Sequence, residues 1–211
     1  MIAVLDARSG NVDSVINVLR SLPYAVSIAR RGADLSAAHT IILPGVGSAG
    51  AYMKRLKRND LLPATVDAYA NGVRLVGICL GLQVLFDGSE EDGGVECLGF
   101  LNGGVTKLAA HAGRSHTGWA PFNFERKYLF DSDHNAVYAA TRSRTVRGRV
   151  YYNHEYGVPV IQKDRVAGAV AINNPSFELF ASMVITEQII GMQFHPEKSQ
   201  QTGLRLLSMV L

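Results

Sequence analysis

The hydrophobic residues of the first third of the chain alternate between short continuous runs and a helical spacing. The apolar run at residues 2–5 has the length of a buried strand, and the apolar residues between Val12 and Leu19 then fall on one face of a helix. Asn11 stands where an N-cap is expected, and Pro23 ends that helix. Further strands are predicted at residues 24–28 and 40–43, and a further helix from residue 47 or 48 to about residue 56. Because strands alternate with helices, we expect a parallel sheet that is covered on both faces.

The pattern changes from about residue 99, where short apolar runs separated by turns replace the alternation of strands and helices. Such runs are typical of strands joined by turns. They are predicted around residue 105 and at residues 119–124, 137–140, 150–152, 158–161, 166–172 and 179–185. We expect them to extend the same sheet. Residues 1–211 would then form a single α/β domain with a mixed, mostly parallel central sheet flanked by helices, and with an antiparallel extension in the second half.

The strongest local pattern lies at residues 73–86, where a continuous apolar run ends at Cys79 and apolar residues then recur at helical spacing. Gly77 and Gly81 flank the cysteine as in a nucleophile elbow, whose sharp turn requires small neighbours. The start of a helix beside the sulfur favours the thiolate, which is the reactive form. Cys79 is therefore a candidate nucleophile, and the alternative is a buried structural cysteine in a tight turn.

A glycine-rich loop at residues 43–50 directly follows the third predicted strand. Gly45 and Gly47 bracket Val46, so the backbone can turn sharply there and present its N–H groups outward. Such donors could stabilise a developing oxyanion, and the loop could alternate between a state that presents the donor and one that turns it away. The alternative is an ordinary strand-to-helix loop with a helix cap at Gly47 or Ser48.

A strand predicted near the C-terminus ends at His195. Because side chains alternate along a strand, His195 and Glu197 can point the same way across the intervening Pro196. A histidine beside a thiolate can take and return its proton, and a carboxylate on the far ring nitrogen fixes the tautomer and the orientation of the ring. For an isolated pair of this kind, a surface ion pair is the alternative.

Composition narrows the class of protein further. A hydrophobic content of 47% is enough to bury a sizeable core, and 21 basic against 18 acidic residues leave a net charge of +3, too small to indicate nucleic acid as the main partner. The two cysteines, Cys79 and Cys97, lack C-x-x-C spacing, which argues against a disulfide framework or a cysteine-based zinc site. The N-terminus lacks a signal-peptide pattern, and no stretch approaches the length of a membrane span. We expect a cytoplasmic protein with no metal, no cofactor and no membrane contact.

Three motifs, at residues 44–47, 77–83 and 193–200, together resemble the class I glutamine amidotransferase family. Within that family, the likeness is to the glutaminase subunit of imidazole glycerol phosphate synthase, the HisH type. The resemblance implies a mostly parallel sheet between helices and the hydrolysis of L-glutamine. It also implies a separate synthase subunit of the cyclase type, which uses the ammonia in histidine biosynthesis.

The resemblance also implies roles for single residues. Cys79 would attack the side-chain amide carbon of glutamine, His195 would carry the proton to the departing ammonia, and Glu197 would orient His195. The remaining implied roles are oxyanion N–H groups from Val46 and Leu80, and glutamine contacts from Gly47 and Gln83.

The chain departs from the family pattern in three segments, at residues 6–11, 115–120 and 152–156. In the last of these, Glu155 stands where a small hydroxyl residue is expected, and its carboxylate would repel the α-carboxylate of glutamine if it faced the substrate. His116 and His154 are interpreted as structural or interface residues. Three alternatives stay open: a paralogous glutaminase that supplies ammonia to a nucleotide-sugar or surface-polysaccharide amidotransferase, a catalytically silent regulatory or scaffold subunit, and a cysteine hydrolase of peptides or small amides.

Overall fold

The computed structural model describes residues 1–8, 10–108, 115–125, 145–159, 170–172 and 180–211. The strand predicted at residues 137–140 lies outside these residues, as do residues 160–161, 166–169 and 179 of three other predicted strands. The remaining predicted elements can be compared with the structure directly.

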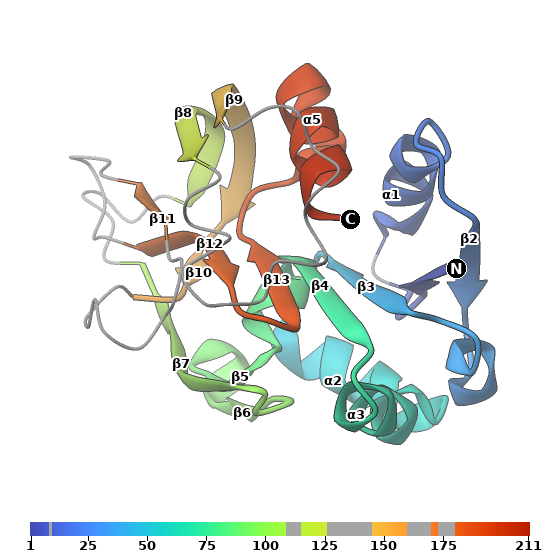
Figure 1. Cartoon of the computed structure of the whole chain (residues 1–211). Coiled ribbons are helices and arrows are strands. Elements are labelled where there is room, and N and C mark those ends of the chain that lie inside the picture. The colour runs from blue at the N-terminus through green and yellow to red at the C-terminus, as the bar shows by residue number, and fades with distance from the viewer. Residues whose placement is uncertain (9, 109–114, 126–144, 160–169, 173–179) are drawn as a thin grey trace.

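A seven-stranded sheet forms the centre of the molecule, in the order β11–β12–β13–β4–β3–β1–β2 (Figure 1). Its five parallel strands are β1 (Ile2–Leu5), β2 (Val26–Ala29), β3 (Thr40–Gly45), β4 (Arg74–Cys79) and β13 (Ile189–Met192). Two antiparallel strands, β12 (Phe180–Ile185) and β11 (Val170–Ile172), complete one edge. This arrangement confirms the prediction of a mixed, mostly parallel sheet with an antiparallel extension.

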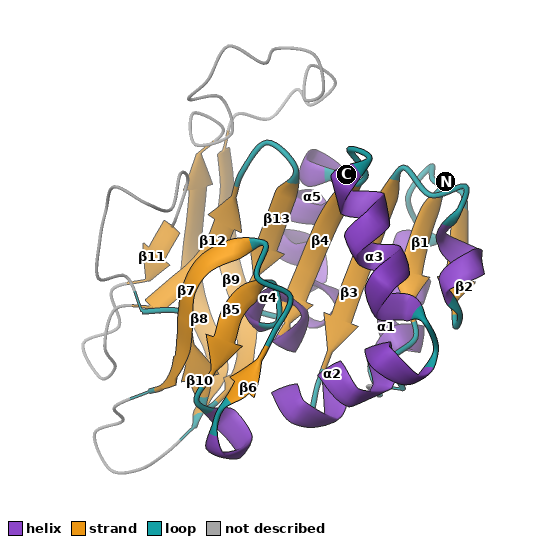
Figure 2. Cartoon of the chain, turned by 90° about the horizontal axis from the view of Figure 1, so that it is seen from below, coloured by secondary structure: helices purple, strands orange, loops and turns teal. Residues whose placement is uncertain are grey.

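Helices cover both faces of this sheet, as the alternation of strands and helices predicted. On one face lie α1 (Val12–Leu19) and α5 (Gln200–Val210), and on the other lie α2 (Ala49–Arg58) and α3 (Leu61–Ala70) (Figures 1 and 2). Successive residues of a strand enter opposite cores: Ile42 packs in the cluster that contains α1, whereas Ile41 packs in the cluster that contains α2. The continuous apolar runs of these strands therefore result from burial on both sides.

The strands predicted around residue 105 and at residues 119–124 and 150–152 do not extend the central sheet, so that expectation was wrong; the remaining strands form two smaller sheets. A four-stranded sheet in the order β10–β7–β5–β6 lies on the same side as α2 and α3, and a two-stranded ribbon lies on the side of α5 (Figures 1 and 2). The four strands are β5 (Phe86–Ser89), β6 (Val95–Glu96), β7 (Leu101–Lys107) and β10 (Tyr156–Gly157), and the ribbon strands are β8 (His116–Glu125) and β9 (Thr145–His154). Short 3-10 helices are η1 (Gly32–Leu35) between β2 and β3, η2 (Glu91–Gly93) between β5 and β6, and η4 (Pro196–Lys198) between β13 and α5.

The helix predicted after Cys79 is much shorter than its apolar spacing indicated. It is the four-residue α4 (Leu80–Gln83), and Phe86 already begins β5. The spacing of Leu82, Leu85 and Phe86 matched one helical face, but Leu85 packs in the core with α2 while the other two pack under the smaller sheet. Burial in two separate cores explains why the chain turns into a strand here.

Candidate active site

Cys79 lies at the turn between β4 and α4, and its backbone has a conformation that residues other than glycine rarely adopt. Its φ of 54° and ψ of −109° are outside the regions that non-glycine residues favour. A Cβ atom on Gly81 would collide with the carbonyl oxygen of Leu43, and one on Gly77 would lie 2.6 Å from the carbonyl oxygen of Gly81. Gly81 is therefore needed for the close approach of the elbow to β3, and Gly77 is needed for the close approach of α4 to β4. Such strain costs on the order of 1–3 kcal/mol and is typical of functional positions.

His195 and Glu197 form a buried pair and not a surface ion pair. His195 Nδ1 lies 2.8 Å from Glu197 Oε1, and neither side chain has exposed surface. Pro196 begins η4 between them, so that the two side chains turn toward each other. The hydroxyl of Ser199 donates to the carbonyl oxygen of His195 at 2.6 Å and accepts the backbone N–H of Tyr151 at 3.0 Å. These contacts hold the histidine between η4 and β9.

Asn11 supports this pair, although its predicted role was different. It occupies the N-cap position of α1, but its side chain makes no capping hydrogen bond. Asn11 Nδ2 instead donates to Glu197 Oε1 at 3.2 Å, across 186 residues of sequence. The interpretation of Asn11 as a side-chain cap was therefore wrong, because its amide is oriented toward Glu197, where it makes a charge-assisted hydrogen bond.

The structure brings the sulfur and the imidazole together at one edge of the sheet. Since β4 and β13 are parallel neighbours with Met192 opposite Ile78, Cys79 and His195 leave the sheet at the same end. Burial alone would lower the pKa of His195, but the adjacent sulfur and the carboxylate of Glu197 outweigh it and raise the pKa to about 10. His195 Nε2 has no aligned hydrogen-bond partner among the described residues, so this nitrogen is left to exchange a proton with the sulfur.

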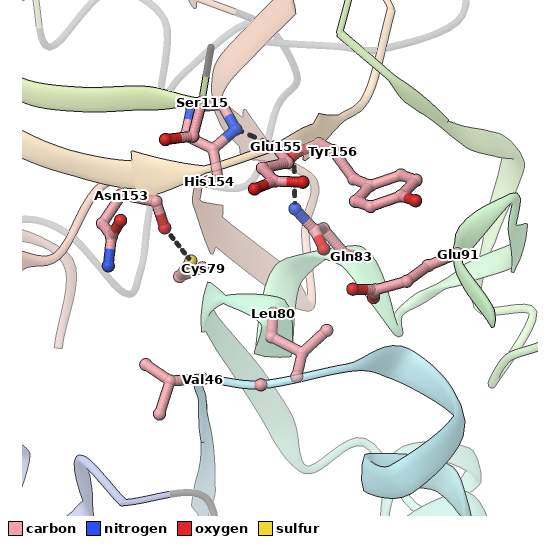
Figure 3. Close-up of a pocket in the computed structure, with 11 residues that line it drawn as sticks. Val46, Cys79, Leu80, Gln83, Glu91, Ser115, Asn153, His154, Glu155 and Tyr156 are labelled. Carbon is pink, nitrogen blue, oxygen red and sulfur yellow. Dashed lines mark hydrogen bonds between the residues drawn. The ribbon is translucent and has the colours of Figure 1, made fainter. Parts of the chain in front are cut away.

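A cavity of about 330 Å³ opens beside Cys79 (Figure 3). It is lined by residues of the cysteine elbow, the glycine-rich loop, η2 and the end of β9: Val46, Gly47, Cys79, Leu80, Gln83, Glu91, Ser115, Asn153, His154, Glu155 and Tyr156. Every residue assigned to the oxyanion site or to glutamine binding therefore faces one cavity. His195 interacts with Cys79 but is not among the lining residues, and none of it is exposed.

The two predicted oxyanion donors lie next to each other at the wall of this cavity. Gly45 is opposite Cys79 in the register of β3 and β4, which places Val46 beside Leu80. Gly47 has a φ of 102°, so the chain turns away immediately after Val46. Among the described residues, the N–H groups of Val46 and Leu80 donate to no protein acceptor. Both groups are thus available to an oxygen bound in the cavity.

The side chain of Gln83 is held by hydrogen bonds within the protein, which limits how it can contact a substrate. Its Nε2 donates to the carbonyl oxygen of Tyr156 at 2.7 Å and to Gln193 Oε1 at 3.1 Å. Both N–H bonds of its amide are therefore used inside the protein, and only Oε1 is left to accept a hydrogen bond from a ligand.

Two carboxylates make one side of the cavity acidic. Glu91 Oε2 accepts the N–H of Ala49 at 2.8 Å, while burial raises the pKa of Glu91 and the charges of Asp92 and Glu155 add to that effect. The carboxylate of Glu155 lies on the same side of the cavity as Gln83 and Tyr156 (Figure 3). No lysine or arginine occurs among the described lining residues. The cavity therefore favours a cationic group at this end.

His116 and His154 form a buried, neutral pair, and His154 of this pair lines the cavity. His154 Nδ1 lies 2.7 Å from the carbonyl oxygen of Tyr156, so it carries the proton, and its Nε2 must accept from His116 Nδ1 at 3.1 Å. Burial lowers the pKa of His116 to about 4 and that of His154 to about 3. The contact of His154 with Tyr156 holds the segment after β9 in place, and the interpretation of both histidines as structural or interface residues stays a prediction. No cluster of three metal-ligating side chains occurs in the described part of the chain.

Comparison with known proteins places the chain among relatives of one kind. A family model described as glutamine amidotransferase class-I matches residues 3–209. The chain is 36% identical over 209 residues to the imidazole glycerol phosphate synthase subunit HisH of Gloeobacter violaceus. The matched region covers 98% of this chain and 86% of that protein. It is 33% identical over 209 residues to the imidazole glycerol phosphate synthase hisHF of Emericella nidulans. Here the matched region covers 97% of this chain and 36% of that protein. The structure of PurLQS from Thermotoga maritima shares the fold, with a TM-score of 0.68 at 17% identity over 99% of this chain and 96% of the matched chain.

Proposed function

The chain belongs to the class I glutamine amidotransferase family, as its three motifs predicted, and on this premise we propose that it hydrolyses L-glutamine to glutamate and ammonia through a thioester on Cys79. One observation carries the proposal: a strained cysteine lies beside a buried histidine whose far ring nitrogen is held by a carboxylate. A nucleophile, a base and an orienting group are the parts that covalent amide hydrolysis requires. We assign these roles to Cys79, His195 and Glu197.

In the proposed reaction, the sulfur of Cys79 attacks the side-chain amide carbon of glutamine, and the carbonyl oxygen takes up negative charge. His195 holds the thiol proton on Nε2 and gives it to the departing nitrogen, so that ammonia leaves and a thioester remains. Water then attacks the thioester while His195 accepts its proton, which releases glutamate and restores the thiol. Glu197 keeps the proton on Nδ1 throughout and so presents Nε2 to the reacting atoms.

Val46 and Leu80 are the proposed oxyanion donors, because their N–H groups border the cavity next to the sulfur. Loss of one such donor typically costs about 100-fold or more in rate. The glycines on either side of Val46 lower the cost of rotating its peptide group. We therefore expect slow hydrolysis until a partner settles this loop.

The opposite end of the cavity is the proposed site for the amino-acid end of glutamine. Glu91 would bind the α-ammonium group, and Oε1 of Gln83 would accept a hydrogen bond from the substrate. Gly47 borders the same space without a side chain, which leaves room for the substrate beside Val46.

The ammonia is proposed to pass to a separate synthase subunit of the cyclase type in histidine biosynthesis. The relatives named above support this partner, because they are called a subunit of imidazole glycerol phosphate synthase or a longer form of it. On this proposal the protein acts in the cytoplasm as half of a heterodimer with lyase activity. Within the described residues, no helix has the length and apolar character needed to cross a membrane.

The proposed function is tested by treating the protein with 6-diazo-5-oxo-L-norleucine, an electrophilic glutamine analogue, and by weighing the product. We expect one adduct on the wild type and on Cys97→Ala, and none on Cys79→Ala. Release of glutamate from L-glutamine should depend on Cys79 in the same way and should rise when the cyclase subunit is added. A wild-type protein that gains no adduct and releases no glutamate, with or without the partner, would exclude the proposed function.

Glu155 favours a second candidate function, in which the chain keeps the fold but not the affinity for glutamine. Its exposed carboxylate faces the cavity, where it would repel the substrate α-carboxylate. A catalytically silent subunit would behave in this way. A paralogue that feeds a nucleotide-sugar amidotransferase would instead keep activity and change its partner.

A substitution at Glu155 tests whether its charge weakens the binding of glutamine. We expect Glu155→Ser to lower KM for L-glutamine by roughly twofold to fivefold, because a partly exposed like charge costs about 0.5–1 kcal/mol. KM for L-glutamine α-amide, which lacks the α-carboxylate, should not change, and Glu96→Ser, outside the cavity, should change neither value. If Glu155→Ser changed the KM values of both substrates equally, the repulsion argument would be wrong.

A further inference from the structure

Gln193 is a fully buried polar residue to which the reaction described above gives no role. It follows the last residue of β13, and its backbone N–H donates to the carbonyl oxygen of Ser182 at 2.9 Å. None of its surface is exposed. Its side chain lies between two residues of the site: Nε2 is 3.7 Å from the sulfur of Cys79, and Oε1 is 3.1 Å from Gln83 Nε2. Because a buried amide is costly unless its polar atoms are paired, these contacts hold the side chain in one orientation.

The neighbouring contacts determine which end of this amide faces the sulfur. Gln83 Nε2 is 2.7 Å from the carbonyl oxygen of Tyr156, which can only accept, so that atom of Gln83 must be the donor nitrogen. The end of the Gln193 amide that faces it must then be the oxygen. The NH₂ group of Gln193 consequently points at the sulfur, since the reversed amide would place two NH₂ groups against each other.

Two groups beside the sulfur of Cys79 favour opposite protonation states of this sulfur. The carbonyl oxygen of Asn153 lies 3.9 Å from Cys79 Sγ, where it accepts from the thiol and repels the thiolate. The N–H of Gln193 has the opposite effect, because a donor binds an anion more strongly than a neutral sulfur. The charged or titratable side chains that face this region are His195 after β13, His154 at the end of β9, Glu155 after it, and Glu91 of η2 across the cavity.

We propose that Gln193 is a further catalytic residue of this site, whose side-chain N–H stabilises the Cys79 thiolate that attacks the amide. Gln83 is the positioning residue, because it fixes the Gln193 amide through the oxygen and is itself anchored on Tyr156. The inference rests on the proposed function for the identity of the reaction. The hydrogen bond itself acts on the sulfur whatever the electrophile is.

The test measures the pH dependence of alkylation of Cys79 by iodoacetamide, followed by intact mass in a Cys97→Ala background. Gln193→Met has a similar volume and lacks both the donor and the acceptor. Gln193→Glu keeps an oxygen for Gln83 and replaces the donor beside the sulfur with a second oxygen. The comparison of these two variants separates loss of the donor from loss of the contact with Gln83.

A matched control lies at the other end of the same strand. Gln188 Nε2 donates to the carbonyl oxygens of Tyr69 and Val73 at 2.6 and 2.8 Å, just before β13 begins. Gln188→Met therefore removes a half-buried amide with two hydrogen bonds, far from the sulfur. Thermal unfolding of each variant, followed by circular dichroism, reports whether it is folded.

We expect the midpoint of the alkylation rate against pH to rise by about one pH unit in Gln193→Met and by at least as much in Gln193→Glu, which is roughly a tenfold loss of rate below the midpoint. Gln188→Met should keep the wild-type midpoint. A wild-type midpoint in the folded Gln193 variants would overturn the inference, and if Gln193→Met does not fold, Gln193→Glu alone decides. Because iodoacetamide needs no glutamine site, failure of the wild type to hydrolyse glutamine would count against the proposed function alone.

Discussion

Replacement of Glu197 by glutamine removes a charge from the buried histidine pair while keeping the shape of the side chain. Glu197 Oε1 lies 2.8 Å from His195 Nδ1 and 3.2 Å from Asn11 Nδ2, and no surface of the pair is exposed. In the wild type, burial lowers the pKa of His195, but the sulfur of Cys79 and the carboxylate outweigh it and raise the pKa to about 10. With a neutral amide in place, only the sulfur opposes burial, so the pKa of His195 should fall.

The expected size of the effect follows from the kind of hydrogen bond that is lost. A bond to a charged group contributes about 1.5–3 kcal/mol, and a bond between neutral groups contributes about 0.5–1.5 kcal/mol. Glu197→Gln should therefore remove about 1–2 kcal/mol of stabilisation from the imidazolium, which is about one pKa unit. If the same loss applies to the transition state in which His195 carries the proton, kcat should fall by roughly fivefold to thirtyfold.

The assay is glutamate release by the wild type and by Glu197→Gln, measured from about pH 6 to about pH 11 so that the alkaline limb of the wild type is included. The proposed acid is functional while His195 keeps its proton, so activity should be lost as the pH rises through the pKa of His195. We expect this alkaline limb to move downward by about one pH unit in the variant, with little change in KM. Equal kcat values and coincident alkaline limbs would refute the assignment of Glu197 as the group that orients and charges His195.

Three further changes test how the fold supports the site. Gly81→Ala pushes a methyl group into the backbone of β3 and should lower the free energy of unfolding by about 1–3 kcal/mol in urea, whereas Gly104→Ala, with no atom closer than 3.9 Å, should not; equal losses would contradict the packing argument. Asn11→Ala loses a 3.2 Å bond to the carboxylate beside the proposed base and should lower kcat by roughly threefold to tenfold, while Asn71→Ala, which loses a 2.7 Å bond to a helix carbonyl, should not. The pKa of His116 is lowered to about 4, so its contribution to stability is present above the unfolded pKa of about 6.5 and is lost as the pH falls toward 4. His116→Gln should therefore weaken the dependence of Tm on pH in this window, and an unchanged slope would exclude that contribution.

The elements that position the nucleophile could be predicted well from the sequence, because they are governed by local patterns. The run that becomes β4 is buried on both faces, so its apolar residues are continuous up to Cys79. The sharp turn was also predictable, since Gly77 and Gly81 occupy positions where no Cβ fits. What the pattern did not predict is the end of α4, because Leu85 and Phe86 satisfy the helical spacing and yet belong to different cores.

The direction of parallel strands predicts that the sulfur and the imidazole lie close together. It does not predict which other side chains support them. Strands that run in parallel end at the same edge, so Cys79 and His195 could be expected to meet once both were placed at strand ends. The rule does not say which further polar side chains reach that edge. Asn11 stood at a helix N-terminus, where a local cap was the simplest explanation, and only the packing of α1 beside η4 brings it to Glu197. Gln193 carried a sequence signal that can be used elsewhere: it precedes His195 by two residues, and in a chain that stays extended beyond the strand, period two predicts the amide and the proposed base on the same side.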